Sequence, residues 1–288
     1  MAHIVVIGAT GLLGSEIAEA VLIQEHEAVI VTRARTAKNE AQLDHFSASG
    51  AEIALTSVTD LRGMTEVLKG ADAVVCAVAG EVETIRSIEY PLLEAAKAAE
   101  VKRFVPNEFG LDTLRLPVGT GAIFDEKKRF QQAIRDSGVP YTIVFNGGIF
   151  DYFPPNLREE PAIMTFGDKL DLPFYSHARE DIGAIAVRAA LDDRCKNQYV
   201  HLKYNLVTQN ETQAILYANY PDYDFPKALI STEEIMDGTH EVKTAVWIDG
   251  HCGKADPSCL DPAELYPDHQ HISAADALSD PQFVFGER

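Results

Sequence analysis

The sequence predicts an α/β protein, with a doubly wound parallel sheet of the Rossmann type and a smaller C-terminal α+β lobe. In the first half of the 288-residue chain, short strands rich in β-branched residues alternate with helical segments. The first strand also runs directly into a glycine-rich turn that opens a helix. Strands that alternate with helices form parallel sheets with right-handed crossovers. We therefore expect a Rossmann domain over residues 1–150 and a second lobe over residues 151–288.

The expected elements follow from short apolar runs and from the residues that bound them. Strand-like runs predict strands over residues 3–8, 28–32, 51–55, 73–78, 103–105, 141–145 and 198–202. Helical spacing predicts helices over residues 14–23, 60–69, 85–99, 123–137, 179–191, 212–217 and 231–236. Pro91 is expected to disturb or split the helix over residues 85–99. The proline-rich stretch 150–161 is expected to be the loop that crosses to the second lobe.

Charge and composition exclude several classes of function. The formal net charge is −19, so we expect neither nucleic acid nor an anionic membrane as a direct partner, because both attract clustered cations. No apolar run approaches the ~20 residues needed to span a bilayer, and the start of the chain lacks a basic secretory leader. We expect a cytoplasmic protein. Cys252 and Cys259, with His240 and His251 nearby, match no common zinc spacing, so we expect no metal site.

The strongest motif is the glycine-rich turn after the first strand. It reads Gly8-Ala9-Thr10-Gly11-Leu12-Leu13-Gly14, a GxxGxxG spacing. Gly8 permits the tight turn, Gly11 lets the backbone approach a pyrophosphate, and Gly14 lets the helix pack closely on the sheet. The N-terminus of the following helix offers N–H groups and a positive dipole end to phosphates. This context predicts a dinucleotide-binding turn.

The end of the second strand indicates which dinucleotide binds. An acidic residue there would favour the ribose hydroxyls of NAD, but the sequence places Arg33 and Arg35 there, with Lys38 close behind. Arginine at this place suits a 2′-phosphate, and in so acidic a chain the three cations are a functional signal. We therefore expect NADP(H) as the cofactor, with Arg33 and Lys38 at its phosphate.

Three further turns fall at the carboxyl ends of predicted strands, where a doubly wound sheet carries its ligand. They add candidate cofactor contacts at Val78, Ala79, Asn107, Phe109, Asn146 and Gly147. The two asparagines can supply side-chain hydrogen bonds, and glycine lets a nicotinamide lie against the backbone. Beyond them, Phe150, Tyr152 and Phe153 are candidates for an aromatic wall of the substrate site.

One lysine is expected to face inward. On the helix over residues 123–137, Ile123, Phe124, Phe130 and Ile134 form an apolar stripe, and Lys127 falls inside it. A lysine directed at a core or cleft is costly unless it is paired or functional, and such a lysine can exchange a proton beside a hydride transfer. The alternative is a lysine whose stem covers apolar surface while its ammonium reaches water. Helical geometry alone leaves both interpretations open.

Another lysine pattern is misleading. Tyr199 and Lys203 have the YxxxK spacing of short-chain dehydrogenases, which works on a helix, where residues four apart share a face. Here the pair lies in a predicted strand, which would separate the two side chains by roughly 13 Å. We do not expect it to be catalytic.

These residues resemble the isoflavone reductase-like branch of the NmrA-like family, which are atypical short-chain dehydrogenases. Besides the glycine turn, the segment from Lys102 to Gly110 resembles the family's "KRFxPSEFG" motif, with Asn107 in the serine place. The segment from Phe124 to Lys127 resembles the one that holds the family's catalytic lysine. The resemblance implies an NADPH-dependent reductase of a small aromatic or secondary-metabolite-type substrate, with Lys127 as general acid or base.

The sequence also departs from the family pattern. Gln131 and Gln132 replace the family's paired arginines, and Asn146-Gly147-Gly148 stands where plant members have "SSNCF", a stretch that the resemblance implies helps to line the substrate site. Two alternatives to the reductase stay open: a non-catalytic NADP-sensing regulator, and a cyclase or isomerase that uses the same site. A homodimer also stays open.

Overall fold

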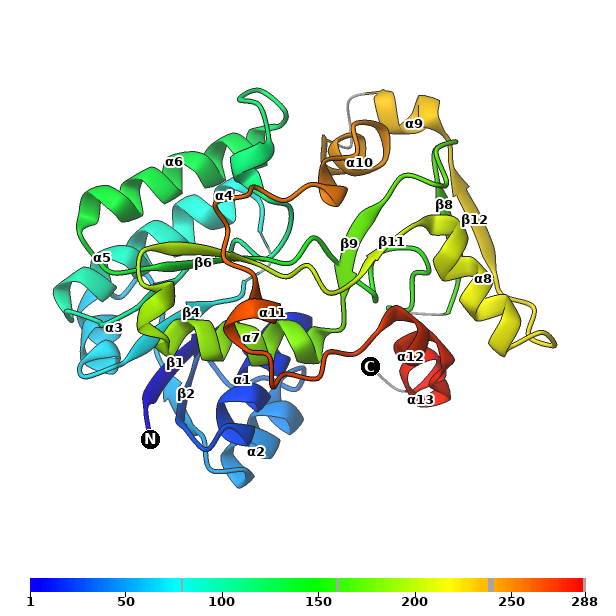
Figure 1. Ribbon diagram of the computed structural model, residues 1–288. Coiled ribbons are helices and arrows are strands. Elements are labelled where there is room, and N and C mark those ends of the chain that lie inside the picture. Colours follow the sequence, from blue (N-terminus) through cyan, green and yellow to red (C-terminus); the bar gives the residue numbers. More distant parts are fainter. Residues whose placement is uncertain (79, 159–160, 238–240, 287–288) are drawn as a thin grey trace. The chain divides into compact units, whose positions relative to one another are not determined.

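The computed structural model describes residues 1–78, 80–158, 161–237 and 241–286, and in it the chain forms two compact units (Figure 1). Unit 1 comprises Met1–Phe109, Ile123–Val144 and Ile182–Val200. Unit 2 comprises Gly110–Ala122, Phe145–Asp181 and His201–Arg288. The boundary expected near residue 150 therefore captures only one of several crossings. Segments of the two units alternate along the chain, because later segments return to complete the sheet of unit 1.

Unit 1 is built on a parallel sheet with strand order β3-β2-β1-β4-β5. The sheet continues through a parallel bridge between Phe104 and Tyr141 to β6, which pairs with β10. This 3-2-1-4-5-6 order is the one expected of a Rossmann sheet. Strands β1 to β3 extend the sheet in one direction and β4 to β6 extend it in the other, so the strand order reverses between β1 and β4. The strands are β1 (His3–Ile7), β2 (Glu27–Thr32), β3 (Glu52–Leu55), β4 (Ala73–Cys76), β5 (Phe104–Val105), β6 (Thr142–Phe145) and β10 (Gln198–His201).

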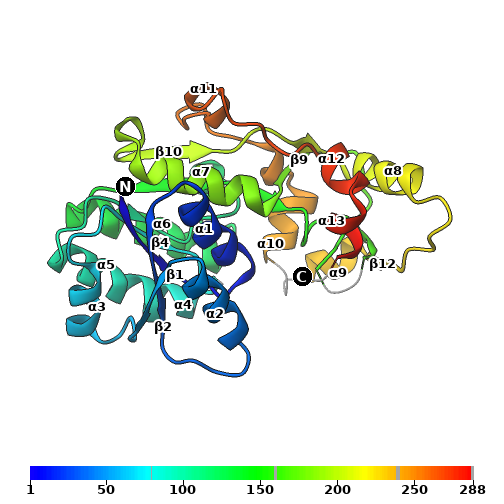
Figure 2. The same ribbon diagram turned by 90° about the horizontal axis from the view of Figure 1, so that it is seen from below.

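Helices cover both faces of this sheet, as Figure 2 shows. One layer contains α1 (Leu12–Ile23), α2 (Glu40–Ala48) and α7 (Arg179–Leu191). The helices α1 and α7 lie very close to each other at Gly183. A Cβ on this residue would come within 2.7 Å of the Glu16 carbonyl oxygen. The other layer contains α3 (Leu61–Leu68), α4 (Val82–Thr84), α5 (Tyr90–Ala98) and α6 (Ala122–Ser137).

The helix expected over residues 85–99 contains a π-helical turn, η1 (Ile85–Glu89), between α4 and α5. Pro91 in the first turn of α5 has no N–H, and its ring disfavours the usual carbonyl partner one turn earlier. The extra residue in such a turn rotates the preceding side chains relative to a regular helix, and π turns are frequent at functional sites. Glu89, the last residue of η1, is 1% exposed.

Unit 2 is an α+β arrangement with two small sheets, of order β11-β9-β7 and β12-β8. Its strands are β7 (Gly148–Ile149), β8 (Ile163–Phe166), β9 (Phe174–His177), β11 (Leu206–Val207) and β12 (Lys227–Ile230). Its helices include α8 (Gln209–Asn219), α9 (Thr232–Met236), α10 (Glu241–Lys243), α11 (Pro262–Leu265), α12 (Ala274–Ser279) and α13 (Pro281–Phe285). Trp247 anchors part of its core, with ring centroids 5.0 Å from those of both Phe166 and Phe174.

Candidate active site

The glycine turn has the geometry that its spacing predicts. Gly8 has φ +89°, and a Cβ there would lie 2.6 Å from the Ala77 carbonyl oxygen at the end of β4. A Cβ on Gly14 would lie only 2.0 Å from the Gly8 carbonyl oxygen, so α1 packs directly on the turn. Gly11 is exposed, and its Cβ would meet only the Gly8 oxygen at 3.3 Å. Gly8 and Gly14 are thus required by the fold, whereas Gly11 keeps the outer surface of the turn bare.

The turn opens onto a cavity of about 860 Å³ at the carboxyl edge of the sheet in unit 1. Such an edge, at the point where strand order reverses, is where doubly wound sheets bind ligands. The first turn of α1 carries no acidic side chain that would oppose a phosphate. The cavity is lined by Ile7, Gly8, Thr10, Val31, Thr32, Arg33, Ala34, Thr36, Asn39, Thr56, Ser57, Val58, Thr59, Val78, Ser87 and Ile88.

Of the three cations expected near the 2′-phosphate, Arg33 alone lines this cavity. Its side chain forms no ion pair within the described part of the chain, whereas the Arg35 Nη1 lies 2.5 Å from an Asp44 carboxylate oxygen. Lys38 is exposed and lies outside the lining. Asn39 accepts the Thr36 N–H at 2.7 Å and so orders the loop behind Arg33. The structure therefore favours Arg33 as the anion-binding residue and leaves Lys38 a prediction.

The loop after β3 also lines the cavity, through Thr56, Ser57, Val58 and Thr59. These residues could not be predicted from the sequence, because nothing in a short polar loop indicates that its strand lies beside the cavity. The Ser57 and Thr59 hydroxyls lie 2.8 Å apart and hold the loop in shape. The loop therefore adds polar groups to the cavity that Arg33 also lines.

The ends of β4 and β5 are joined by the side chain of Asn107, which donates a hydrogen bond to the Val78 carbonyl oxygen. Val78 itself lines the cavity, and Phe109 is half-buried. Ala79, the other residue expected here, lies outside the described residues. Asn107 therefore helps to shape the backbone that the nicotinamide end would contact.

Lys127 lies on α6 and is half-buried, on the same side of the helix as Phe124, Phe130 and Ile134, which are at most 5% exposed. The stripe that the periodicity predicts is therefore present. Two acidic residues that the sequence analysis did not single out, Glu89 and Glu108, lie close enough for the Lys127 charge to act on both.

Both carboxyl groups are 1% exposed. One Glu89 oxygen accepts the backbone N–H of Asn107 at 2.9 Å, and Glu108 is hydrogen-bonded by the Gln131 amide. Burial raises the pKa of Glu89 to about 7, against the opposing effects of the Asn107 N–H and Lys127. Burial likewise raises the pKa of Glu108, which Lys127 and Gln131 partly counteract. The Lys127 charge therefore acts on two buried acidic groups.

In unit 2, His177 holds the backbone of the candidate residue Asn146, and the Gly147 N–H donates to the Gly110 carbonyl oxygen at 2.9 Å. The backbone N–H of Asn205 donates to the His177 Nε2 at 3.3 Å, so Nδ1 carries the proton and donates to the Asn146 carbonyl oxygen at 2.8 Å. The Asn146 side chain is 2% exposed and donates to the Gly148 carbonyl oxygen at 3.1 Å, while its Oδ1 accepts no hydrogen bond from any described residue. A buried amide oxygen of this kind suits a ligand donor such as a carboxamide.

This arrangement predicts acid lability. Burial lowers the pKa of His177 from 6.5 to about 4, so between these values the unfolded chain binds a proton that the folded chain does not. The free energy of unfolding should therefore be highest above pH 6.5 and fall by about 3 kcal/mol towards pH 4 from this group. His201, whose pKa burial lowers to about 3, acts in the same direction. Urea denaturation at pH 7 and 4.5 measures the loss.

The matched variant is His177→Gln, because a glutamine amide can donate to Asn146 and accept from Asn205 without titrating. Its loss of stability between pH 7 and 4.5 should be smaller than that of the unaltered protein. An equal loss in both proteins would contradict the assignment to His177.

The three aromatic candidates for the substrate wall differ in exposure. Phe150 is 1% exposed and packs in a core cluster of unit 2 with Ala178, Ala274 and Ala277. It cannot present a ring to a ligand without leaving this cluster. Tyr152 is 39% exposed, and Phe153 is half-buried, with its ring 5.4 Å from that of Trp247. Tyr152 and Phe153 therefore stay candidates for substrate contact, with Phe150 as support.

The Tyr199–Lys203 spacing lies on strand β10 and the residues after it, as expected. The Arg135 Nη1 donates to the Tyr199 hydroxyl at 2.7 Å, and the Lys203 Nζ lies 3.8 Å from an Asp261 oxygen. The four cysteines are free and buried, and no group of three or more metal-ligating side chains occurs in the described ranges. None of the helices in those ranges has the length and apolar composition needed to cross a membrane.

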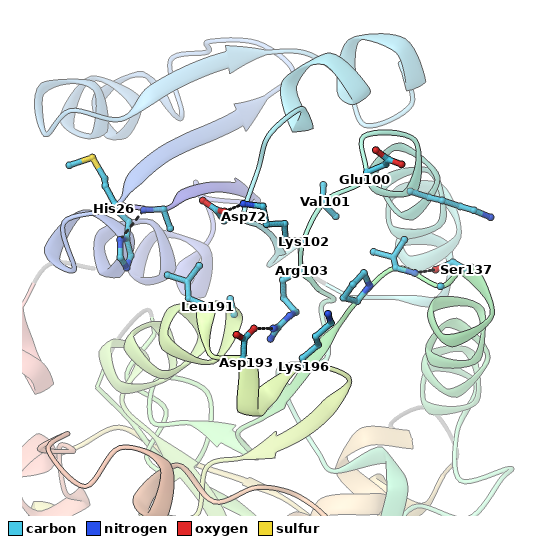
Figure 3. A pocket seen from close by; sticks show the side chains of 17 residues that line it. His26, Asp72, Glu100, Val101, Lys102, Arg103, Ser137, Leu191, Asp193 and Lys196 are labelled. Atoms are coloured by element: carbon cyan, nitrogen blue, oxygen red, sulfur yellow. Dashed lines mark hydrogen bonds and ion pairs between the residues drawn. The ribbon is translucent and has the colours of Figure 1, made fainter.

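A second cavity, of about 810 Å³, lies at the opposite edge of the sheet in unit 1, beside the residues that precede the strands (Figure 3). The charged side chains that line it form ion pairs with one another or hydrogen bonds to neighbouring groups. The Lys102 Nζ lies 2.6 Å from Asp72, and the buried Arg103 donates to the Thr142 hydroxyl and to the carbonyl oxygens of Ala189 and Asp192. We therefore place the functional site at the carboxyl edge.

A glycine turn and an arginine-lined cavity at the carboxyl edge of a Rossmann sheet are the features of a dinucleotide-binding protein. The chain belongs to the NmrA-like family, whose model matches residues 1–220. It is 30% identical over 256 residues to the bifunctional pinoresinol-lariciresinol reductase of Linum album, covering 81% of this chain and 76% of that protein. It is 28% identical over 304 residues to a phenylcoumaran benzylic ether reductase of Pinus taeda, covering 96% and 97%.

Solved structures give the same result for the fold. The leucoanthocyanidin reductase of Vitis vinifera, solved as a binary complex with NADPH, superposes with a TM-score of 0.82 at 24% identity, covering 96% of this chain and 98% of that one. An isoflavone reductase superposes with a TM-score of 0.79 at 25% identity over the same shares. The Rossmann fold is thus confirmed, and the chain stands among oxidoreductases.

Proposed function

We propose that this protein is an NADPH-dependent reductase of a small aromatic substrate, of the phenylpropanoid-derived kind named for its relatives. The observation that carries the proposal is Lys127, which is half-buried and whose charge acts on two buried carboxyls in the unit that also holds the glycine turn. Ile88, which precedes Glu89 in the sequence, lines the cavity proposed for the cofactor, so Glu89 lies next to the lining of this cavity.

The residues present fit NADP(H). Gly11 leaves room for a pyrophosphate at the N-terminus of α1, Arg33 has no competing ion pair in the described ranges, and the Asn146 Oδ1 is an orphaned buried acceptor. The bound nicotinamide would supply a hydride to the substrate. Lys127 would give a proton to the substrate atom that gains the electron pair. Tyr152 and Phe153 would contact the aromatic part of the substrate.

Loss of NADPH absorbance with a panel of enones, benzylic ethers and related phenolic compounds tests the reductase. An NADP-sensing regulator would bind the cofactor and consume none with any of them. A cyclase or isomerase would form product without consuming NADPH. No specific contact in unit 1 favours either of these over reduction, and the sensor would not need Lys127.

Arg33→Ala should lower the preference for NADPH over NADH by about 10- to 100-fold, because a charge-assisted hydrogen bond to the 2′-phosphate is lost. Arg35→Ala is the matched control, since Arg35 is tied to Asp44 outside the cavity lining. The ratio of the two dissociation constants, from fluorescence titration, measures the effect. An unchanged ratio in Arg33→Ala would remove the phosphate assignment.

A further inference from the structure

The side chain of Asn107 holds the ends of two neighbouring strands of the Rossmann sheet together. β5 ends at Val105, and the following Pro106 has no N–H to continue the ladder. The chain turns there, with the Glu108 N–H donating to the Pro106 carbonyl oxygen at 2.8 Å. Asn107, inside this turn, donates its side-chain amide to the carbonyl oxygen of Val78, past the end of β4. Asn107 therefore fixes backbone that lies beyond the ends of both strands.

A buried carboxyl group fixes Asn107 in turn. One oxygen of Glu89 accepts the backbone N–H of Asn107 at 2.9 Å, and Glu89 is 1% exposed. This bond satisfies a backbone donor beyond the end of β5, and both the carboxylate and the neutral acid have an oxygen that can accept it. The bond therefore does not depend on whether Glu89 is ionised. Two hydrogen bonds in series thus connect Glu89 to Val78.

Both ends of this series adjoin the cavity proposed for the cofactor. Val78 lines the cavity, and so do the two residues that precede Glu89 on η1. The chain after Val78 fits closely against Asn107, because a Cβ on Gly80 would lie 3.0 Å from the amide nitrogen of Asn107. Displacement of Asn107 would therefore move the part of the cavity wall that the end of β4 supplies.

Burial alone would favour an apolar side chain at position 89. A buried carboxyl group loses hydration that a leucine does not need, and the hydrogen bond from Asn107 offsets only part of that loss. What glutamate supplies and leucine cannot is an acceptor for the Asn107 N–H. The charge of Lys127 also acts on the Glu89 carboxyl group, so an experiment must separate the acceptor of Glu89 from its charge.

We propose that Glu89 is a positioning residue for the cofactor: through Asn107 it fixes the backbone at the end of β4 against which NADP(H) binds, an inference that rests on the proposed function. The role requires neither contact between Glu89 and the cofactor nor a proton transfer. Loss of the acceptor lets the turn after β5 shift and weakens the binding of NADPH. Loss of the charge alone leaves the series of hydrogen bonds in place.

The experiment measures the dissociation constant of NADPH by fluorescence titration. Glu89→Leu removes the acceptor and should raise this constant about tenfold, the effect of one charge-assisted hydrogen bond. The variant should stay folded, because leucine is suited to a buried position. Glu89→Gln removes the charge but keeps an acceptor oxygen, so its constant should stay within about threefold of that of the unaltered protein. Glu94→Leu, the control, removes the same charge at an exposed position of α5 and should leave the constant unchanged.

A double variant tests whether Glu89 acts through Asn107. Asn107→Leu keeps the backbone N–H but removes the amide that holds Val78, so it should also raise the dissociation constant about tenfold. Adding Glu89→Leu should raise it less than about threefold further, because the connection to Val78 is already broken. Effects that multiply to about a hundredfold would mean that Glu89 acts independently of Asn107 and would overturn the proposal.

Hydrogen–deuterium exchange gives a second measurement, in the cofactor-free protein. Glu89→Leu should speed exchange of the Asn107 backbone N–H, whereas Glu89→Gln should leave it close to that of the unaltered protein. Unchanged exchange in Glu89→Leu, or an equal loss of affinity in Glu89→Leu and Glu89→Gln, would overturn the positioning role. Neither measurement requires turnover. An unaltered protein that binds NADPH but consumes none with any substrate would overturn the proposed reductase and leave the result for Glu89 standing.

Discussion

Replacing Lys127 by alanine is expected to lower kcat for NADPH oxidation by about 10²- to 10⁴-fold, the usual contribution of a positioned general acid. Binding of NADPH should persist, because the glycine turn and Arg33 lie on other elements. The fold should persist as well, because loss of the ammonium raises the pKa values of Glu89 and Glu108 further and so favours the neutral forms of these buried carboxyls. Steady-state kinetics and fluorescence titration separate these two effects.

The neighbouring lysine provides the control. Lys128→Ala removes the same charge from the next position of α6, which helical geometry turns by about 100° away from Lys127. Its kcat should stay close to that of the unaltered protein. Turnover in Lys127→Ala at the rate of Lys128→Ala would mean that Lys127 serves only to balance the buried carboxyls.

Much of the Rossmann unit could be predicted from the sequence, because local patterns determine it. The β-branched runs become β1, β2 and β4, and the glycine spacing becomes a turn whose contacts match the role of each glycine. The interleaving of the two units could not be predicted in this way. It depends on β10 pairing with β6 and on α7 packing against α1, which are contacts between segments far apart in the sequence.

A site residue could be predicted where the residues next to it in the sequence determine which way its side chain points. The apolar stripe of α6 indicated Lys127, and the basic strand end indicated Arg33. Glu89 and Glu108 were missed because a lone glutamate in a helix or turn is usually exposed. The π turn that buries Glu89 cannot be predicted from a regular helical period, because it adds one residue to the turn. Pro91 indicated a disturbance of the helix here, but not its kind. Glu108 lies in the segment from Lys102 to Gly110, whose resemblance to the family motif assigns no role to this residue.

Gly14→Ala is expected to destabilise the fold strongly. The added Cβ would lie 2.0 Å from a backbone oxygen, that of Gly8, and no flexible side chain can move aside to relieve the overlap. Either α1 leaves the sheet or the turn opens, and the free energy of unfolding should fall by about 3 kcal/mol or more. Thermal unfolding should report a melting temperature lower by roughly 6 °C or more, together with loss of NADPH binding.

Gly11→Ala adds the same methyl group three residues earlier and should behave differently. Its Cβ would lie 3.3 Å from the Gly8 oxygen, a contact that a shift of a few tenths of an ångström relieves, so the melting temperature should stay nearly unchanged. Affinity for NADPH should nevertheless fall by about tenfold or more, because the methyl occupies the space that a pyrophosphate needs next to the backbone. Normal affinity in a stable Gly11→Ala protein would show that the diphosphate binds elsewhere. The two variants together thus separate what the turn contributes to the fold from what it contributes to the ligand.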